Sequence, residues 1–296
     1  MSSETSSEHP LPTIHVSMAA FPGLRHEQAV QLAMDAAAHG RLSDPWFGPL
    51  STRHIQLVPQ NHGVLTPTLC VQLMATYPEV RFRLHANVRV QASLDRADLA
   101  TFERYPRWFA QAAKLHRMLG ASSYTAHAGL RKHASMSGML DNARRCADLF
   151  GSPVGVEGLY PTAGDAYLVS TWSEYRQLMD SGVPYAIDLS HLNILATQSR
   201  QRDDGLVQDF LACERCLEVH ISANDGRGDW HQCCQIRDGE PWWAPMLRHV
   251  HAQALVFCEG NLRESRREGS SHRVSPASGF GLESSMKGNS HHECIH

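Results

Sequence analysis

The chain has 296 residues, of which 42% are apolar, so it is long enough to bury one large hydrophobic core. Its formal net charge is −3, which excludes the broad positive field of proteins that hold duplex DNA through its phosphates. Nineteen histidines are a high count, and because histidine is the commonest metal ligand, metal binding has to be considered from the start.

The first residues predict no targeting segment. Residues 1–12, MSSETSSEHPLP, have neither a charged n-region nor an apolar h-region, so we expect a flexible N-terminus rather than a secretory signal. No apolar run approaches the length of a transmembrane helix, so no membrane partner is expected. A cytoplasmic location with reduced thiols follows as the expectation. Cys213-x-x-Cys216 has zinc-knuckle or redox spacing but no second pair, and we interpret it, like Cys233-Cys234, as ordinary thiols.

Short β-rich apolar runs alternate with longer amphipathic stretches along most of the chain. The runs predict strands at 13–18, 54–59, 81–88, 123–129, 153–158, 184–190, 216–222 and 254–260. The stretches between them predict helices at 26–40, 66–77, 98–120, 136–151, 171–182, 203–214 and 241–253. Several of these helical stretches end in glycine, as helix C-termini do. The regular alternation is typical of a (β/α)8 TIM barrel.

An open doubly wound sheet is the alternative fold, but no GxGxxG follows the first strand. We therefore predict one TIM-barrel domain at 13–264, with a short or missing eighth helix. Residues 265–296 are rich in Ser, Gly and His without any period, and they predict a disordered tail. The tail residues His291, His292, Cys294 and His296 could bind metal adventitiously.

Potential metal ligands stand at the ends of six consecutive predicted strands. In chain order they are His85, His127, Glu157, Asp188, His220 and Glu259. The carboxyl ends of barrel strands converge on the face where active sites lie, so these side chains should meet at one mouth. Three more ligands follow strands six and seven, and glycines at 226 and 228 would let their loop fold over the mouth: His191, Asp229 and His231.

The chemistry of these nine residues predicts bound cations. Burying a carboxylate costs several kcal/mol unless a cation or donor compensates it, and basic residues are scarce near these strand ends. Nine ligands exceed the roughly three that one catalytic zinc uses, and a carboxylate can bridge two ions. We therefore expect two or three divalent ions, of zinc, manganese or iron. Arg131 and Arg227 could hold an anionic substrate group there, or have ordinary solvent-exposed roles.

From about residue 81 to 260 these residues resemble the xylose-isomerase-like TIM barrels, in particular the branch that includes endonuclease IV. Beyond the strand-end residues, the resemblance rests on HAG at 127–129, VEG around Glu157, DLSH at 188–191, DWH at 229–231 and CEG around Glu259. It implies three metal sites, two of which share Glu157 as a bridge. One would use His85, His127 and Glu157; the second Glu157, Asp188, His220 and Glu259; the third His191, Asp229 and His231.

The sequence departs from that pattern at some positions. Ala128 and Gly158 stand where endonuclease IV has a proline and an asparagine, and its basic DNA-gripping loops are not found. The chain is also similar to multinuclear non-haem iron oxidases that modify peptides, which share the D-x-H pair and a following aromatic stretch. Those enzymes have Asn where this chain has His191. Trp242-Trp243 in that stretch would form a wall at the mouth or pack a helix on the barrel.

The first functional hypothesis is a metal-dependent enzyme in which Glu157, His220 and Glu259 are catalytic. It would use metal-activated water or a metal-polarised substrate oxygen on a phosphoester, a sugar-like compound or a small peptide. The alternatives are a sugar isomerase or epimerase with one or two metals, in which Glu157 and Glu259 shuttle a proton, and a multinuclear iron oxidase. A barrel that binds ligands without catalysis is a further alternative, and charge disfavours an abasic-site DNA endonuclease. The sequence leaves the oligomeric state open.

Overall fold

The computed structural model describes residues 11–92 and 96–263, and eight parallel strands form its centre. The strands hydrogen-bond in the order β5-β4-β1-β10-β9-β8-β7-β6, so that β5 and β6 lie at the two ends of a nearly closed barrel. A side-chain contact between His85, which follows β5, and Thr125 on β6 links these ends. The barrel strands are β1 (Ile14–Ser17), β4 (Ser51–Leu57), β5 (Arg81–Leu84), β6 (Tyr124–His127), β7 (Val154–Glu157), β8 (Tyr185–Asp188), β9 (Cys216–Ile221) and β10 (Leu255–Cys258).

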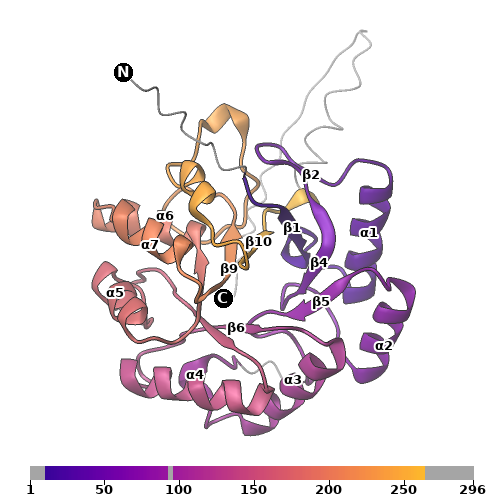
Figure 1. The fold of residues 1–296 in the computed structure, drawn as a ribbon, viewed down its shortest axis with the longest axis horizontal. Helices are drawn as coiled ribbons and strands as arrows, with labels where there is room; N and C mark the ends of the chain where they lie inside the picture. The colour runs from indigo at the N-terminus through magenta and orange to yellow at the C-terminus, as the bar shows by residue number, and fades with distance from the viewer. Residues whose placement is uncertain (1–10, 93–95, 264–296) are drawn as a thin grey trace, which may run out of the picture.

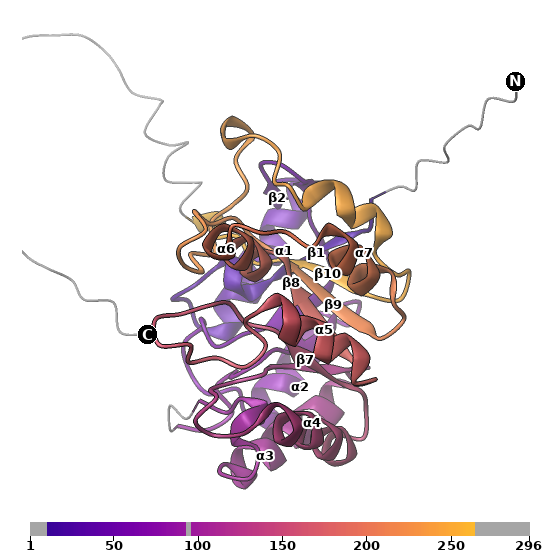
Figure 2. The same ribbon diagram turned by 90° about the vertical axis from the view of Figure 1, so that its left-hand side faces the viewer.

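Helices surround the strands on the outside (Figures 1 and 2). They are α1 (His26–Ala38), α2 (Pro67–Thr76), α3 (Pro106–Leu119), α4 (Met136–Phe150), α5 (Trp172–Asp180), α6 (Leu189–Ser199) and α7 (Asp204–Ala212). The shorter elements are the 3-10 turns η1 (Met18–Ala20), η2 (Leu99–Thr101), η3 (Ile236–Asp238) and η4 (Ala244–His249), and an antiparallel pair of strands, β2 (Ser43–Asp44) and β3 (Gly48–Pro49).

The strands are short apolar runs because both of their faces are covered, one by the barrel interior and one by helices. Every residue of β1, β7 and β8 is buried. Three helices, α2, α4 and α5, begin where the side-chain oxygen of Thr66, Ser135 or Thr171 accepts from a backbone N–H group of the first turn. Gly120 and Gly151 end α3 and α4 in the left-handed conformation that glycine adopts without strain.

The structure confirms the predicted barrel and all eight strands. The helical predictions are confirmed except for two, and one further helix was not predicted. The stretch 98–120 is divided into η2 and α3, because Pro106 lacks the N–H group of a helix interior and takes the first helical position. The prediction of an α-helix at 241–253 is wrong: only the short η4 forms, and Pro245, which is tolerated in the first turn of a helix but not in its interior, prevents a helix from running through it from residue 241. The sequence analysis missed α6, which begins directly after β8.

The predicted tail at 265–296, including its histidines and Cys294, lies outside the described residues, as does most of the predicted N-terminal segment at 1–12. Within the described ranges, no helix combines the length and apolar character that a membrane crossing needs.

Candidate metal centre

The predicted ligands converge at the carboxyl ends of the barrel strands. In-register pairing puts His127 beside Glu157 and Asp188 beside His220 on neighbouring strands. A cavity of about 120 Å³ opens among these strand ends. It is lined by eight of the nine predicted ligands, namely His85, His127, Glu157, Asp188, His191, Asp229, His231 and Glu259. The ninth, His220, is completely buried below them.

Glu157 is the central group of this cluster. Its side chain is 1% exposed and faces four imidazole rings. Its Oε2 lies 3.5 Å from Nε2 of His85, and its Oε1 lies 3.5 Å from Nδ1 of His220. Oε1 also lies 3.8 Å from His127 Nε2 and 3.8 Å from His191 Nδ1. A carboxylate surrounded in this way by nitrogens at non-bonding distances can serve as a ligand shared between ions.

The histidines around Glu157 are oriented by contacts to one of their two ring nitrogens. His85 Nδ1 lies 3.3 Å from Thr125 Oγ1, and His191 Nδ1 lies 2.9 Å from the carbonyl oxygen of Gly158. Metal-binding histidines in proteins almost always have an outer partner of this kind, which fixes the tautomer and the ring orientation. One nitrogen of each ring therefore remains directed into the cluster.

His127 and His220 have carboxylates as outer partners. His127 Nδ1 lies 3.5 Å from Asp98 Oδ1, and His220 Nε2 lies 3.1 Å from Glu218 Oε2. Asp98 is itself held by Asn87, whose amide donates to it at 2.7 Å. The arrangement matches the carboxylate–histidine–metal geometry that raises the basicity of the ligand.

A loop between β9 and β10 adds Asp229 and His231 from the other side. Asp229 Oδ2 lies 3.1 Å from His231 Nε2 and 3.4 Å from His191 Nε2. His231 Nδ1 lies 3.5 Å from Glu259 Oε2, which connects this pair to the centre. His231 has a φ of 47°, an uncommon conformation for a non-glycine residue, so the loop holds this ring in place at a conformational cost.

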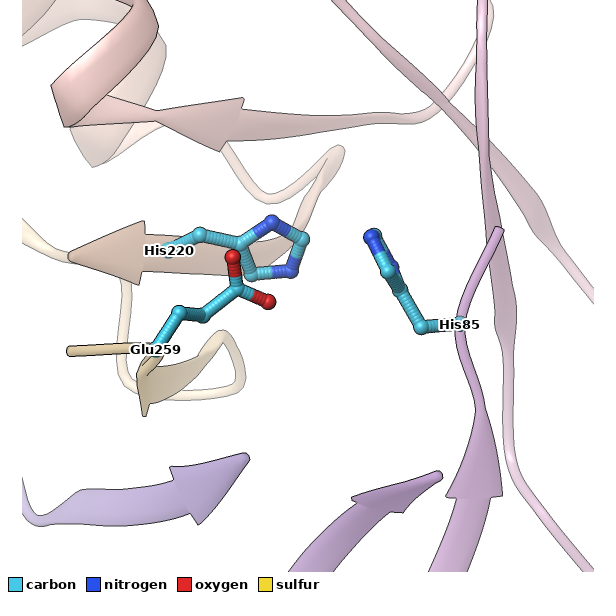
Figure 3. A group of neighbouring side chains, drawn as sticks. All are labelled: His85, His220 and Glu259. Atoms are coloured by element: carbon cyan, nitrogen blue, oxygen red, sulfur yellow. The ribbon is translucent and has the colours of Figure 1, made fainter. Parts of the chain in front are cut away.

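Three overlapping groups have their ligand atoms within 4.8 Å of one another. They are His85, His220 and Glu259; His85, His127 and Glu157; and Glu157, Asp188 and His220. Figure 3 shows the first group, with the carboxylate of Glu259 and the rings of His220 and His85 directed toward a common space from opposite sides of the barrel. His85, His220 and Glu157 each belong to two of these groups.

The electrostatics of the site reflect many charges buried together. Burial would lower the pKa of His191, but the charges of Asp188 and Asp229 outweigh it and raise the pKa to about 10. Burial raises the pKa of Glu259 to about 7, against the opposing charges of His220 and His231. Burial also works to raise the pKa of Glu157, yet the facing imidazoles, His220 first, hold it well below its usual value. The carboxylates thus draw positive charge into the mouth.

The donor set fits divalent metal ions. Glu157 Oε2, His220 Nδ1 and His231 Nδ1 are buried polar atoms with no hydrogen-bond partner, and all three face the cluster. Buried polar atoms normally find a partner, because an unpaired one costs roughly 1–3 kcal/mol. Imidazole and carboxylate ligands of this kind suit zinc, manganese or iron.

The arginines predicted near the mouth lie elsewhere. Arg131 donates to Glu174 at 2.5 Å and to Asp165 at 3.1 Å, and neither it nor the exposed Arg227 lines the cavity. The basic residue that does line it is Arg96, which lies 3.5 Å from Asp98 and over the ring of Tyr167. The sequence analysis passed over Arg96 because it follows no strand.

The structure shows where the two tryptophans at 242–243 and the two cysteines at 213 and 216 lie. Trp243 is buried and stacks on Phe47, with ring centroids 5.9 Å apart, so it packs in the core of the protein. Trp242 is part-buried and donates to Asn193 Oδ1 at 2.9 Å. Cys216 is buried and Cys213 part-buried, and in the described part of the chain none of the three ligand groups includes a cysteine.

Comparisons with known proteins concern the fold. No family model and no curated protein matches the chain. Among solved structures, a D-tagatose 3-epimerase-like protein aligns with a TM-score of 0.59 at 16% identity, over 88% of this chain and 95% of its own. A family 2 AP endonuclease from Brucella melitensis aligns with a TM-score of 0.56 at 15% identity, over 89% and 100%.

A D-allulose 3-epimerase from a Methylomonas species aligns with a TM-score of 0.54 at 14% identity, over 90% of this chain and 92% of its own. Identities this low establish the fold and leave the activity open. The structural neighbours are xylose-isomerase-like TIM barrels, as the sequence resemblance implied, and the chain has their fold.

Proposed function

We propose that this chain is a metal-dependent enzyme whose barrel mouth binds two or three divalent cations, with Glu157 as the shared ligand. The observation that supports it most is the position of the Glu157 carboxylate, buried among four imidazoles that each have one ring nitrogen held by another group. The structural neighbours include sugar epimerases and an AP endonuclease, so the fold is compatible with catalysis at this mouth.

The nine ligands divide among the ions as the overlapping groups suggest. His85 and His127 would share one ion with Glu157, and Asp188 and His220 would hold a second with the same carboxylate. We assign Glu259 to this second ion as well, because its carboxylate forms a group with His220 and His85. His191, Asp229 and His231 would hold a third, because their ligand atoms approach each other at 3.1–3.4 Å. Such cations would polarise an oxygen of water or of the substrate and stabilise the negative charge that develops there.

The residues around the ions would select a small substrate. The cavity of about 120 Å³ admits only a small group, and its outer wall is formed by Arg96, Tyr160 and Tyr167. Tyr160 packs on the ring of His191, with centroids 4.9 Å apart, and so holds that ligand from the substrate side. A phosphoester, a sugar-like compound or the side chain of a small peptide would fit these surroundings, and the arginine would attract an anionic group.

Metal content tests the proposal directly. Protein purified anaerobically should contain two to three ions per chain by elemental analysis, and Glu157→Gln should lose more than one of them. Glu103→Gln is the matched control, because Glu103 is exposed and pairs only with Arg145 in the described structure. A wild-type protein without bound ions, or a Glu157→Gln variant with full content, would refute the proposal. Iron would indicate oxidation and zinc hydrolysis.

The second candidate function is a sugar isomerase or epimerase with one or two ions. It is favoured by the group of Glu157, Asp188 and His220, which together with Glu259 makes a complete site without the loop residues. The double variant Asp229→Asn/His231→Gln separates the two functions. It should lose one ion per chain if the loop holds a third metal, and it should keep the wild-type content if the enzyme works with fewer.

A further inference from the structure

Directly below the ligands, the barrel interior contains a second layer of polar side chains. Residues two apart on a strand point to the same face, so the residues two positions before His85, His127 and His220 also face inward. They are Arg83 on β5, Thr125 on β6 and Glu218 on β9. Interior layers of TIM barrels usually consist of branched apolar side chains, so a polar layer here needs an explanation.

Glu218 and Arg83 form an ion pair inside the barrel. The guanidinium Nη1 of Arg83 donates to Glu218 Oε1, and the two side chains are 4% and 0% exposed. Gln56 Nε2 and Thr125 Oγ1 donate to the other oxygen, Oε2, at 2.8 and 3.1 Å. A buried ion pair contributes little or nothing to stability compared with an apolar pair of the same volume. Stability alone therefore does not account for these residues.

The contact that explains them is with His220. Its Nε2 lies 3.1 Å from Glu218 Oε2. The carboxylate accepts hydrogen bonds from Arg83, Gln56 and Thr125, so it is ionised and can only accept from the imidazole as well. The amide nitrogen of Gln56 also lies 3.1 Å from Nε2, but it already donates to the same oxygen of Glu218 at 2.8 Å. The proton of the neutral ring is consequently on Nε2.

We infer that Glu218, held by Arg83, is a positioning residue that fixes His220 as an Nδ1 ligand of the metal centre. With the proton on Nε2, the lone pair is on Nδ1, which lies 3.5 Å from Glu157 Oε1 and has no hydrogen-bond partner. Thr125 orients His85 in the same way, because its Oγ1 lies 3.3 Å from Nδ1 of that ring. The polar layer thus orients the ligand layer above it. This inference rests on the proposed metal-dependent function.

The test removes both charges of the pair, because removing one would leave the other buried and unpaired. In the double variant Arg83→Met/Glu218→Gln, the new amide can donate or accept, so the tautomer of His220 is no longer fixed. We expect Co²⁺ to bind this variant 10- to 100-fold more weakly, in line with about 10–100-fold for the loss of an outer partner. Urea denaturation of the metal-free protein should show no comparable loss of stability.

Arg131→Met/Glu174→Gln is the matched control, because it removes an ion pair that lies outside the metal cavity. It should bind Co²⁺ as tightly as the wild type. If the wild type binds Co²⁺ and the Arg83/Glu218 variant binds it equally well with the same visible spectrum, the inference is wrong while the proposed function stands. If the wild type itself binds no Co²⁺, the proposed function fails.

A second measurement needs no variant and remains decisive if the double variant does not fold. In protein labelled with ¹⁵N-histidine and loaded with ¹¹³Cd²⁺, the metal should couple to Nδ1 of His220. Coupling to Nε2 would overturn the inference, because that nitrogen would then have turned away from Glu218.

Discussion

His116, at the end of α3 and away from the metal centre, couples folding to pH. Its side chain is 1% exposed, packs on Phe150 with ring centroids 5.2 Å apart, and lies 2.7 Å from Ser152 Oγ through Nε2. Burial first, and then the positive charges of Arg83 and Arg117, lower its pKa from 6.5 to about 4. The unfolded chain therefore takes up this proton near pH 6.5, and the folded protein only near pH 4. Stability is fully present above pH 6.5 and is lost as the pH falls toward 4.

We predict that His116 alone lowers the free energy of unfolding by about 2 kcal/mol between pH 7.5 and 5.0. The variant His116→Gln should be less stable at pH 7.5 but should lose about 2 kcal/mol less than the wild type over this interval. Urea denaturation at both pH values measures the difference. His39→Gln, at an exposed position after α1, is the control and should keep the wild-type pH dependence. Equal losses in His116→Gln and the wild type would contradict the prediction.

Arg96 and Arg131 offer a second comparison between single residues. Arg96 lines the metal cavity, whereas Arg131 connects the loop after β6 to Glu174 on α5. We predict that Arg96→Met weakens the binding of inorganic phosphate to the metal-loaded protein at least tenfold. Arg131→Met should leave phosphate binding unchanged and lower stability by roughly 0.5–1 kcal/mol, as for a part-exposed ion pair. Calorimetric titration and urea denaturation separate the two effects, and equal phosphate binding by Arg96→Met and the wild type would exclude Arg96 as an anion-binding residue.

At the scale of elements, the loop that connects β9 to β10 depends on its contact with α6. Gly226 in this loop has a φ of +77°, and a Cβ added there would lie 2.5 Å from Thr197 of α6. Any other residue would push the loop, and with it Asp229 and His231, away from the strand ends. We predict that Gly226→Ala loses about one ion per chain while the remaining ions stay bound, which elemental analysis can measure.

Gly239 in the same loop provides the control. It has a φ of +80°, but a Cβ there would meet nothing within 4 Å. With a ψ of −179°, Gly239 lies in a region that glycine alone adopts readily, so Gly239→Ala should carry backbone strain of about 1–3 kcal/mol and still keep the full metal content. If both variants lose metal equally, the loop is sensitive to strain alone, and the packing of Gly226 on α6 is not what places the ligands.

The sequence was sufficient to predict most strands and helices, with α6 as an exception. The strands were predictable because their apolar runs are short and are separated by glycine-ended helical stretches. The helix α6 was missed because Asp188 both ends a strand and caps the helix that follows: its Oδ1 accepts from the backbone N–H groups of Ser190 and His191. No connecting residues separate β8 from α6, so the sequence shows no loop after which a new helix would be expected.

For the whole molecule, the barrel topology made the candidate site predictable, since all strand ends meet at one face. Sequence position alone could not reveal the partners that orient those residues. Glu218 looked like one polar residue in an apolar strand, and its role depends on Arg83, Gln56 and Thr125 from three other strands. Asp98 and Arg96 lie in a connecting segment, where sequence gives no register. Such contacts between distant segments exist only in the folded barrel.

Under the proposed function, the charge buried at the mouth would couple metal binding to the stability of the whole fold. Glu157, Asp188 and Glu259 are each at most 3% exposed, and without cations their charges must be balanced by protons on nearby imidazoles. Ions that bind the folded chain only would stabilise it by about 2.7 kcal/mol per site at a free concentration 100 times the Kd. We therefore predict that a strong chelator lowers the Tm of the wild type and that Zn²⁺ or Mn²⁺ restores it.

Two variants show whether the change in Tm on chelation comes from metal bound at Glu157. Glu157→Gln should unfold at nearly the same temperature with and without chelator, because it has lost the shared ligand. Glu103→Gln, at an exposed site, should respond to the chelator as the wild type does. A wild-type Tm that is indifferent to chelation would mean that the buried carboxylates are balanced by the imidazoles alone. In that case His191 and His231, whose pKa values are raised to about 10 and about 9 mainly by Asp188 and Asp229 against the effect of burial, would supply the positive charge.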